Sequence, residues 1–179
     1  MKHMKRTSVA IGIFTVLWGL TMRAQAPEVN PFVGMWKLNL QRSQSSYSNP
    51  PNYSRLRGYQ DRGGGWMYHT IIDSIGNAAD FTFAAVRYDG KEYPVYTSLT
   101  LGRFLSLGAN SPRTVAFKRT DPRTLEYTDR VLGKITGTGT STVSKDGSTI
   151  TETDRTFDSQ GKETSSAVAV YEKQILDTR

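Results

Sequence analysis

The stretch "NPFVGMWKLN", Asn30–Asn39, holds the residues that decide the fold. Trp36, Leu38 and Leu40 recur at every second position, and polar residues stand between them. Successive side chains of a β-strand point to opposite faces, so this spacing buries one face and leaves the other in water. The pattern therefore predicts a half-buried strand over Phe32–Leu40.

The residues before this strand have the features of a secretory signal peptide, which we assign to residues 1–26. Cations come first, an apolar stretch covers 7–22, and the triplet Ala24–Ala26 has the small-x-small pattern that a signal peptidase accepts. The apolar run is shorter than the roughly 18–20 residues needed to cross a bilayer, and no second run of that kind follows. We expect a periplasmic or secreted protein with one domain over 27–179 and no membrane span after signal removal.

Much of the positive charge of the chain lies in that signal. The whole chain has 23 Lys and Arg residues against 16 Asp and Glu residues, a formal net charge of +7. Four of the cations and none of the acids precede residue 27, so residues 27–179 carry only +3. No cluster of cations replaces them, and we expect no nucleic-acid partner. Because cysteine is absent, the exported domain must be held together by burial and strand pairing without disulfides.

Short apolar or alternating runs separated by turn residues continue to the end of the chain. Regularly spaced short strands without helical patterns between them indicate an antiparallel meander, which tends to close because closure removes its exposed edges. We therefore predict an all-β fold, an antiparallel up-and-down barrel of about 8–10 strands. The later strands are predicted at Arg55–Gln60, Trp66–Asp73, Asp80–Tyr88, Tyr93–Leu101, Arg113–Arg119, Thr124–Leu132, Lys134–Ser144, Thr149–Phe157 and Glu163–Gln174.

Three connecting or glycine-rich segments carry further expectations. The dipeptide Asp89-Gly90 predicts a tight hairpin turn, since both residues tolerate positive φ. The irregular segment Gly102–Pro112 is either a lid that gates the open end of the barrel or a plain loop. Gly137 and Gly139 lack the lysine and the following helix of a phosphate-binding loop, so they predict a bulged or closely packed strand.

The opening strand also resembles a known family. "FVGMWKLN" is similar to the first strand of lipocalins and fatty-acid-binding proteins, which begins with Gly-x-Trp and a basic residue, here Gly34, Trp36 and Lys37. The segments "YDGKEYPV", "VSKDGSTIT" and "AVAVYEKQ" are similar to a group of small exported bacterial lipocalin-like proteins. The resemblance covers nearly all of Pro31–Gln174 and implies a lipocalin-like, calycin-type barrel with Trp36 across its closed end. It also implies a cation from the last strand over the indole, for which Lys173 is the candidate.

Two features of fatty-acid-binding proteins are missing. A Ser/Pro-rich stretch, Gln41–Tyr53, stands where that family has a helical pair. The Arg-x-Tyr carboxylate clamp of its last strand is also absent. The resemblance therefore does not imply a fatty acid as ligand.

The aromatic residues supply the candidate ligand site. In a small barrel they either fill the interior or line a cavity, and tyrosine favours a cavity because its hydroxyl needs a partner when buried. We predict that a small apolar or amphipathic molecule binds there. Arg155 is expected inside, with Glu152 and Asp154 on the wet exterior; if Arg155 lies outside, the carboxylates lie inside. The predicted ligand-binding residues are Trp66, Tyr68, Phe81, Phe83, Tyr88, Tyr93, Phe117, Tyr127 and Arg155.

Two other functions stay open. A cofactor-free isomerase, lyase or hydrolase would use His69 and Tyr68 with a carboxylate as general acid–base groups, and it is favoured if His69 faces the cavity beside an acid. An interaction module would have a barrel filled with side chains and no cavity. Because residues 27–179 contain a single histidine and no cysteine, no metal site and no cofactor is expected. The carboxylate candidates are Asp73, Asp129 and Glu152.

Overall fold

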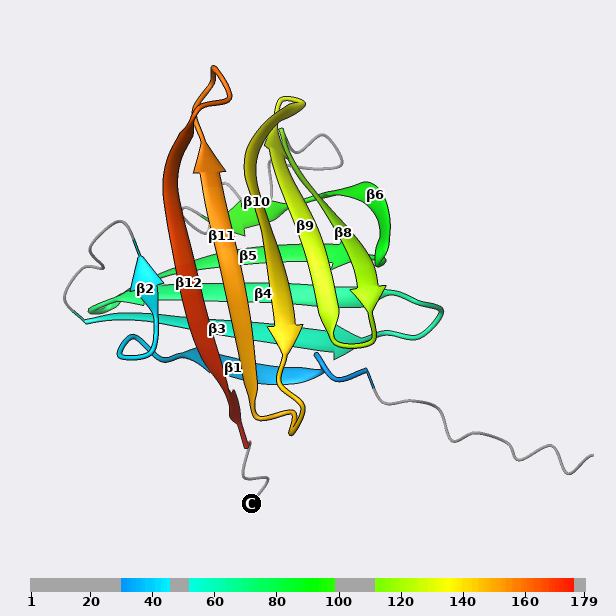
Figure 1. Ribbon diagram of the computed structural model, residues 1–179, viewed down its shortest axis with the longest axis vertical. Helices are drawn as coiled ribbons and strands as arrows, with labels where there is room; N and C mark the ends of the chain where they lie inside the picture. The colour runs from blue at the N-terminus through cyan, green and yellow to red at the C-terminus, as the bar shows by residue number, and fades with distance from the viewer. Residues whose placement is uncertain (1–29, 46–51, 99–111, 176–179) are drawn as a thin grey trace, which may run out of the picture.

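The computed structural model describes residues 30–45, 52–98 and 112–175, and all their regular structure is β-strand (Figure 1). The predicted signal peptide and residues 102–111 of the predicted lid or loop lie outside the described residues. None of the described residues forms a helix with the length and apolarity needed to cross a membrane. The strands are β1 (Gly34–Leu38), β2 (Gln44–Ser45), β3 (Tyr53–Asp61), β4 (Met67–Ile75), β5 (Ala78–Val86), β6 (Asp89–Pro94), β7 (Tyr96–Ser98), β8 (Arg113–Asp121), β9 (Thr124–Val131), β10 (Lys134–Val143), β11 (Thr149–Phe157) and β12 (Glu163–Gln174).

The strands form two crossed layers. In Figure 1, β8 to β12 run roughly perpendicular to β1, β3, β4 and β5, which lie behind them. All belong to one sheet, in the order β6-β8-β9-β10-β11-β12-β1-β3-β4-β5-β7, with the short β2 beside β12. Strands that follow one another in the chain are neighbours almost throughout, which is the arrangement of an up-and-down meander. The predicted all-β antiparallel barrel is therefore confirmed.

The barrel closes through a stretch of chain that is shared between the two layers. β6 pairs with β8, while β7 pairs with β5. Val95, between β6 and β7, donates its N–H to the carbonyl of Arg113 at 3.0 Å. The two ends of the sheet order are thus joined by the chain itself, and the predicted strand Tyr93–Leu101 is divided where it changes its partner.

The predicted hairpin turn at Asp89-Gly90 is wrong. β5 does not pair with β6, whose partner β8 belongs to the other layer. Gly90 has a φ of +79°, and the N–H of Lys91 donates to Oδ1 of Asp89 at 3.0 Å. These residues begin β6, and the register of β6 with β8 shifts between Asp89 and Glu92. The residue types indicate the positive φ, but the strand with which β6 pairs is chosen by the tertiary arrangement.

Trp36 is fully buried and belongs to the hydrophobic core. Its Nε1–H donates to the carbonyl of Phe32 at 2.8 Å, and Nζ of Lys173 lies 5.1 Å from its ring centroid. Gly34 has a φ of +136°, and a Cβ atom there would lie 3.0 Å from Cε of Lys173. A side chain at this position would be strained and would push the lysine away from the indole. The structure thus brings Gly34, Trp36 and Lys173 together.

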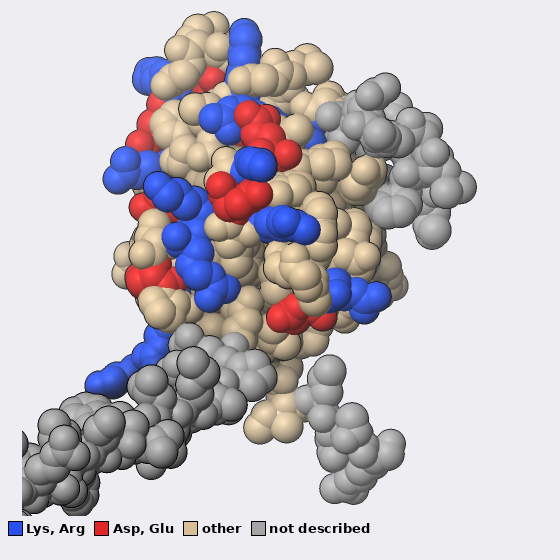
Figure 2. Space-filling model, turned by 90° about the vertical axis from the view of Figure 1, so that its right-hand side faces the viewer, with Lys and Arg blue, Asp and Glu red and all other residues tan. Residues whose placement is uncertain are grey.

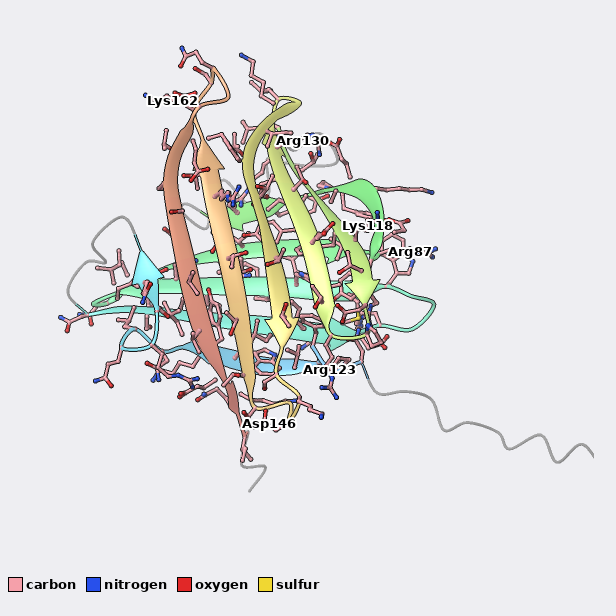
Figure 3. The ribbon with its side chains drawn as sticks, viewed as in Figure 1. Arg87, Lys118, Arg123, Arg130, Asp146 and Lys162 are labelled. Carbon is pink, nitrogen blue, oxygen red and sulfur yellow. The ribbon has the colours of Figure 1, made fainter. Side chains whose placement is uncertain are left out.

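Charged side chains on the visible outer surface are dispersed. On the face shown in Figure 2, Lys and Arg are interspersed with Asp and Glu. Figure 3 shows Lys162 and Arg130 toward one end of the β8–β12 layer and Arg123 and Asp146 toward the other.

Candidate functional site

A cavity of about 480 Å³ lies between the two layers. Its walls come from β3, β4 and β5 of one layer and from β8 to β12 of the other. Pockets that bind small molecules have volumes of about 300–1,000 Å³, so the cavity has the size for a ligand. Its apolar lining residues are Ile71, Ala84, Val95, Val115, Phe117, Val131 and Ala167.

Three arginine–carboxylate pairs form much of the polar lining. Such pairs are favourable, because the guanidinium offers several N–H donors in a plane that matches a carboxylate. Within each pair the two charges cancel. The pairs are Arg57–Glu152 at 2.6 Å, Arg55–Asp73 at 3.1 Å and Arg113–Asp129 at 3.3 Å.

The Arg57–Glu152 pair is the most deeply buried of the three. The side chain of Glu152 is 1% exposed, and that of Arg57 is 12% exposed. Ser141 Oγ donates a further hydrogen bond to Oε1 of Glu152 at 3.0 Å, and the guanidinium lies 5.0 Å from the ring centroid of Tyr171. Burial alone would lower the pKa of Arg57, but Glu152 and Tyr171 hold it well above its ordinary value. The guanidinium of Arg57 therefore stays charged in the interior.

His69 points into the cavity from β4. It is 8% exposed, and its ring lies 4.6 Å from that of Tyr59 and 4.4 Å from that of Phe117, measured between ring centroids. The hydroxyl of Tyr88 lies 2.9 Å from Nε2. Burial, and second the positive charge of Arg57, lower the pKa of His69 to about 3. The imidazole is therefore uncharged at neutral pH.

The charged residues of β11 face the opposite way from the first expectation, with the carboxylates on the inner side of the barrel. Glu152 is buried and Asp154 lines the cavity, whereas the side chain of Arg155 is exposed although it also contributes to the lining. A carboxylate can be buried on β11 because Arg57, on β3 of the opposite layer, supplies the opposite charge. Burial raises the pKa of Asp154, and the nearby Arg57 and Arg55 only partly offset this effect.

Tyr127 and Asp154 belong to one row across three strands. Gly139 on β10 pairs in register with Tyr127 on β9 and with Asp154 on β11. A Cβ atom on Gly139 would lie 2.5 Å from the hydroxyl oxygen of Tyr127 and 2.1 Å from the carbonyl oxygen of Thr153. The tyrosine therefore lies over the glycine. The bulge after Ile135 and this close contact confirm the predicted bulged or closely packed strand.

Several sequence-predicted site residues line the cavity. Phe117 and Tyr127 stand next to each other on β8 and β9, with ring centroids 5.8 Å apart. The cavity also brings together four acid–base candidates, His69, Asp73, Asp129 and Glu152. Each of the three carboxylates is paired with an arginine, and none forms a hydrogen bond with His69 among the described residues.

Six of the predicted aromatic residues do not line this cavity. On β4 the inward positions are taken by His69 and Ile71, so Tyr68 lies on the opposite face, with its ring centroid 5.1 Å from that of Phe83. Trp66 is 37% exposed. Both faces of β4 mix apolar and polar residues, so alternation alone does not reveal which face turns inward. The six residues are Trp66, Tyr68, Phe81, Phe83, Tyr88 and Tyr93.

β3 supplies site residues that the sequence analysis did not single out. Arg55, Arg57 and Tyr59 share its inward face. Arginine at alternate positions ordinarily indicates a strand face that is exposed to solvent. Here that face is buried because Asp73 and Glu152 neutralise the two arginines. Arg57 and Glu152 are 95 residues apart in the chain, and no local pattern connects them.

Comparisons with known proteins support the fold. No protein-family model and no curated protein matches this chain. Among solved structures, a variant of the fluorescent protein UnaG matches with a TM-score of 0.54 and 15% identity, over 82% of this chain and 99% of that one. A protein of unknown function from the DUF3598 family of Nostoc punctiforme matches with a TM-score of 0.50 and 12% identity, over 82% of this chain and 49% of that one. A Schistosoma mansoni fatty acid binding protein in complex with arachidonic acid has a TM-score of 0.48 and 12% identity, over 81% of this chain and 97% of that one. At such identities the first two similarities show the fold alone.

Proposed function

We propose that this chain is an exported binding protein that holds a small, partly apolar molecule inside its barrel. The observation that carries the proposal is the cavity of about 480 Å³, which has an apolar wall and a charged wall. A mostly apolar hollow with a few convergent polar groups is the usual form of a small-molecule site. Export is proposed from the signal-like residues 1–26.

The two walls would act on different parts of the ligand. Apolar ligand surface that leaves water for the side of Val115 and Phe117 contributes roughly 25 cal/mol per Å². The hydroxyl group of Tyr127 would fix the orientation of the bound molecule. The arginine–carboxylate pairs hold the polar wall in place before the ligand arrives, so little ordering is needed on binding.

The geometry favours binding over the acid–base alternative. His69 faces the cavity, but its hydrogen-bond partner is the hydroxyl of Tyr88 and not an acid. With a pKa of about 3, its imidazole is a weak base at neutral pH. Tyr68, the second predicted acid–base residue, lies on the opposite face of β4. The cavity also distinguishes this chain from a barrel filled with side chains.

Native mass spectrometry of the protein purified gently from the cell envelope or the culture medium tests the proposal. We expect one small molecule bound to each chain, released on denaturation. A polypeptide mass that lacks residues 1–26 would support export, and retention of those residues in a cytoplasmic protein would contradict it.

A fluorescent apolar probe gives a second test with a matched control. Ala84 lines the cavity, whereas Ala79 lies on the exposed outer face of the same strand. Ala84→Leu should weaken probe binding because it fills the cavity, and Ala79→Leu should not. Folded wild-type protein without a bound molecule and without probe binding would overturn the proposed function.

A further inference from the structure

The cavity contains one carboxylate whose charge the protein does not pair. The carboxylates in its lining are Asp73, Asp129, Glu152 and Asp154, and each of the first three pairs with an arginine. No ion pair or hydrogen bond joins the side chain of Asp154 to another of the described residues. An ionised carboxylate that is removed from water without a partner is costly. A positively charged group of a bound molecule would therefore stabilise the carboxylate of Asp154.

We propose that the ligand carries a cationic amine head group, and that Asp154 binds it. This inference rests on the proposed function, since it names the class of ligand that the cavity takes. An amphipathic amine would place its hydrocarbon part against the apolar wall. Its ammonium group would complete the charge balance of the polar wall.

The neighbours of Asp154 leave space for such a group. In register with it stand Gly139 on β10 and Ala167 on β12, which have no side chain and a single methyl group. The next residue in this row is Tyr127, whose hydroxyl lies over Gly139. An ammonium group has three N–H donors, and the carboxylate of Asp154 and the hydroxyl oxygen of Tyr127 are acceptors on the same wall.

The arginines of the cavity do not favour an anionic head group in that place. Arg55 and Arg57 lie close enough to affect Asp154 electrostatically, but each is paired at short range with its own carboxylate. Arg155 forms no ion pair with the described residues and contributes to the cavity lining, but its side chain is exposed and, by alternation, leaves β11 on the face opposite that of Asp154. An anion directly beside Asp154 would meet a like charge, and the guanidinium of Arg155 does not share that face of the strand.

Two dansyl probes of opposite charge test the inference. Dansylcadaverine carries a primary ammonium group, and a dansyl-labelled alkanoic acid of similar length carries a carboxylate. We expect the wild-type protein to bind the ammonium probe at least about tenfold more tightly, which corresponds to one charge-assisted hydrogen bond. Asp154→Asn should remove this preference by weakening the ammonium probe about tenfold and leaving the acid probe unchanged or tighter.

Asp80→Asn is the matched control. Asp80 is an exposed carboxylate on β5 that does not line the cavity, so its replacement removes the same net charge without touching the site. It should leave both affinities unchanged. Equal or tighter binding of the acid probe by the wild type, or an equal effect of Asp154→Asn on both probes, would overturn the inference and leave the proposed function standing. Failure of the folded wild type to bind either probe would count against both.

Discussion

At the scale of single residues, Gly139 has the least space for a Cβ atom among the glycines of the described residues. Its missing side chain gives Tyr127 a place on the cavity wall, and the carbonyl oxygen of Thr153 closes the space on the other side. We expect Gly139→Ala to lower the free energy of unfolding by roughly 1–3 kcal/mol, because backbone and tyrosine must both shift. Urea unfolding monitored by circular dichroism measures the change.

Gly137 provides the comparison on the same strand. A Cβ atom there would meet its nearest neighbours, Asp129 Cβ and the carbonyl of Arg155, at 3.5 and 3.6 Å, which is ordinary contact. Gly137→Ala should therefore change the free energy of unfolding by no more than about 0.5 kcal/mol, since alanine also suits a strand better than glycine. Equal effects at the two positions would show that the crowding at Gly139 relaxes without cost.

His69 should make the stability of the fold depend on pH. Its pKa is about 3 in the folded state against 6.5 for the free side chain, so the unfolded chain binds the proton first as the pH falls. The contribution of His69 is complete above pH 6.5 and is lost progressively toward pH 3. Between pH 7 and pH 5 the loss should be about 2 kcal/mol.

The difference between wild type and His69→Gln isolates this effect. Glutamine does not titrate, and the carboxylates that also affect acid stability are the same in both proteins. Urea unfolding at pH 7 and pH 5 should show a larger decrease in the free energy of unfolding for the wild type than for His69→Gln. Equal decreases would mean that the folded protein accepts a proton on His69 as readily as the unfolded chain does.

At the scale of elements, β12 holds the end of β1 in place. The two strands pair antiparallel, with Trp36 opposite Lys173. Lysine covers the indole with its apolar stem and attracts it with its ammonium group, and an exposed cation–π contact contributes about 0.5–1 kcal/mol. We expect the wild type to be the most stable, Lys173→Met to be less stable and Lys173→Ala to be the least stable. Methionine keeps most of the apolar stem and loses only the charge, whereas alanine loses both.

Denaturant unfolding followed by tryptophan fluorescence gives this order. A methionine variant as stable as the wild type would assign the contact to packing alone. An alanine variant as stable as the wild type would show that Lys173 contributes nothing to the barrel end.

At the scale of the whole molecule, the Arg57–Glu152 pair joins the two layers across the interior. Arg57 comes from β3 and Glu152 from β11 on the opposite side of the cavity. Removal of one partner leaves the other charge buried and unpaired, so Arg57→Met and Glu152→Met should each cost roughly 3–5 kcal/mol. The double variant should lose much less than the sum, because two apolar side chains need no counter-charge.

A double-mutant cycle from urea unfolding tests the coupling. Losses that add up would mean that the two charges are stabilised independently by other groups, such as Ser141 beside Glu152. A strong coupling would identify the pair as a link that keeps the layers in register around the cavity.

The sequence alone determined the class of fold and most strand positions. Alternation with a period of two and the turn residues between the runs are local properties, and the structure retains strands at Thr149–Phe157 and Glu163–Gln174 with the predicted limits. The family resemblance of the Gly-x-Trp opening implied a contact between Trp36 and Lys173, and the structure contains it. Alternation and turn residues depend on a few neighbouring residues, so they can be read without the rest of the molecule.

Only the tertiary structure decided which face of each strand turns inward, how the barrel closes and where the cavity lies. Alternation has the same form for either face, and the choice on β11 depends on Arg57, which is 95 residues away from Glu152 in the chain. The division of β6 from β7 likewise depends on two different partner strands. The candidate site is built from such distant pairs, because a charge can be buried only where folding brings its partner to it.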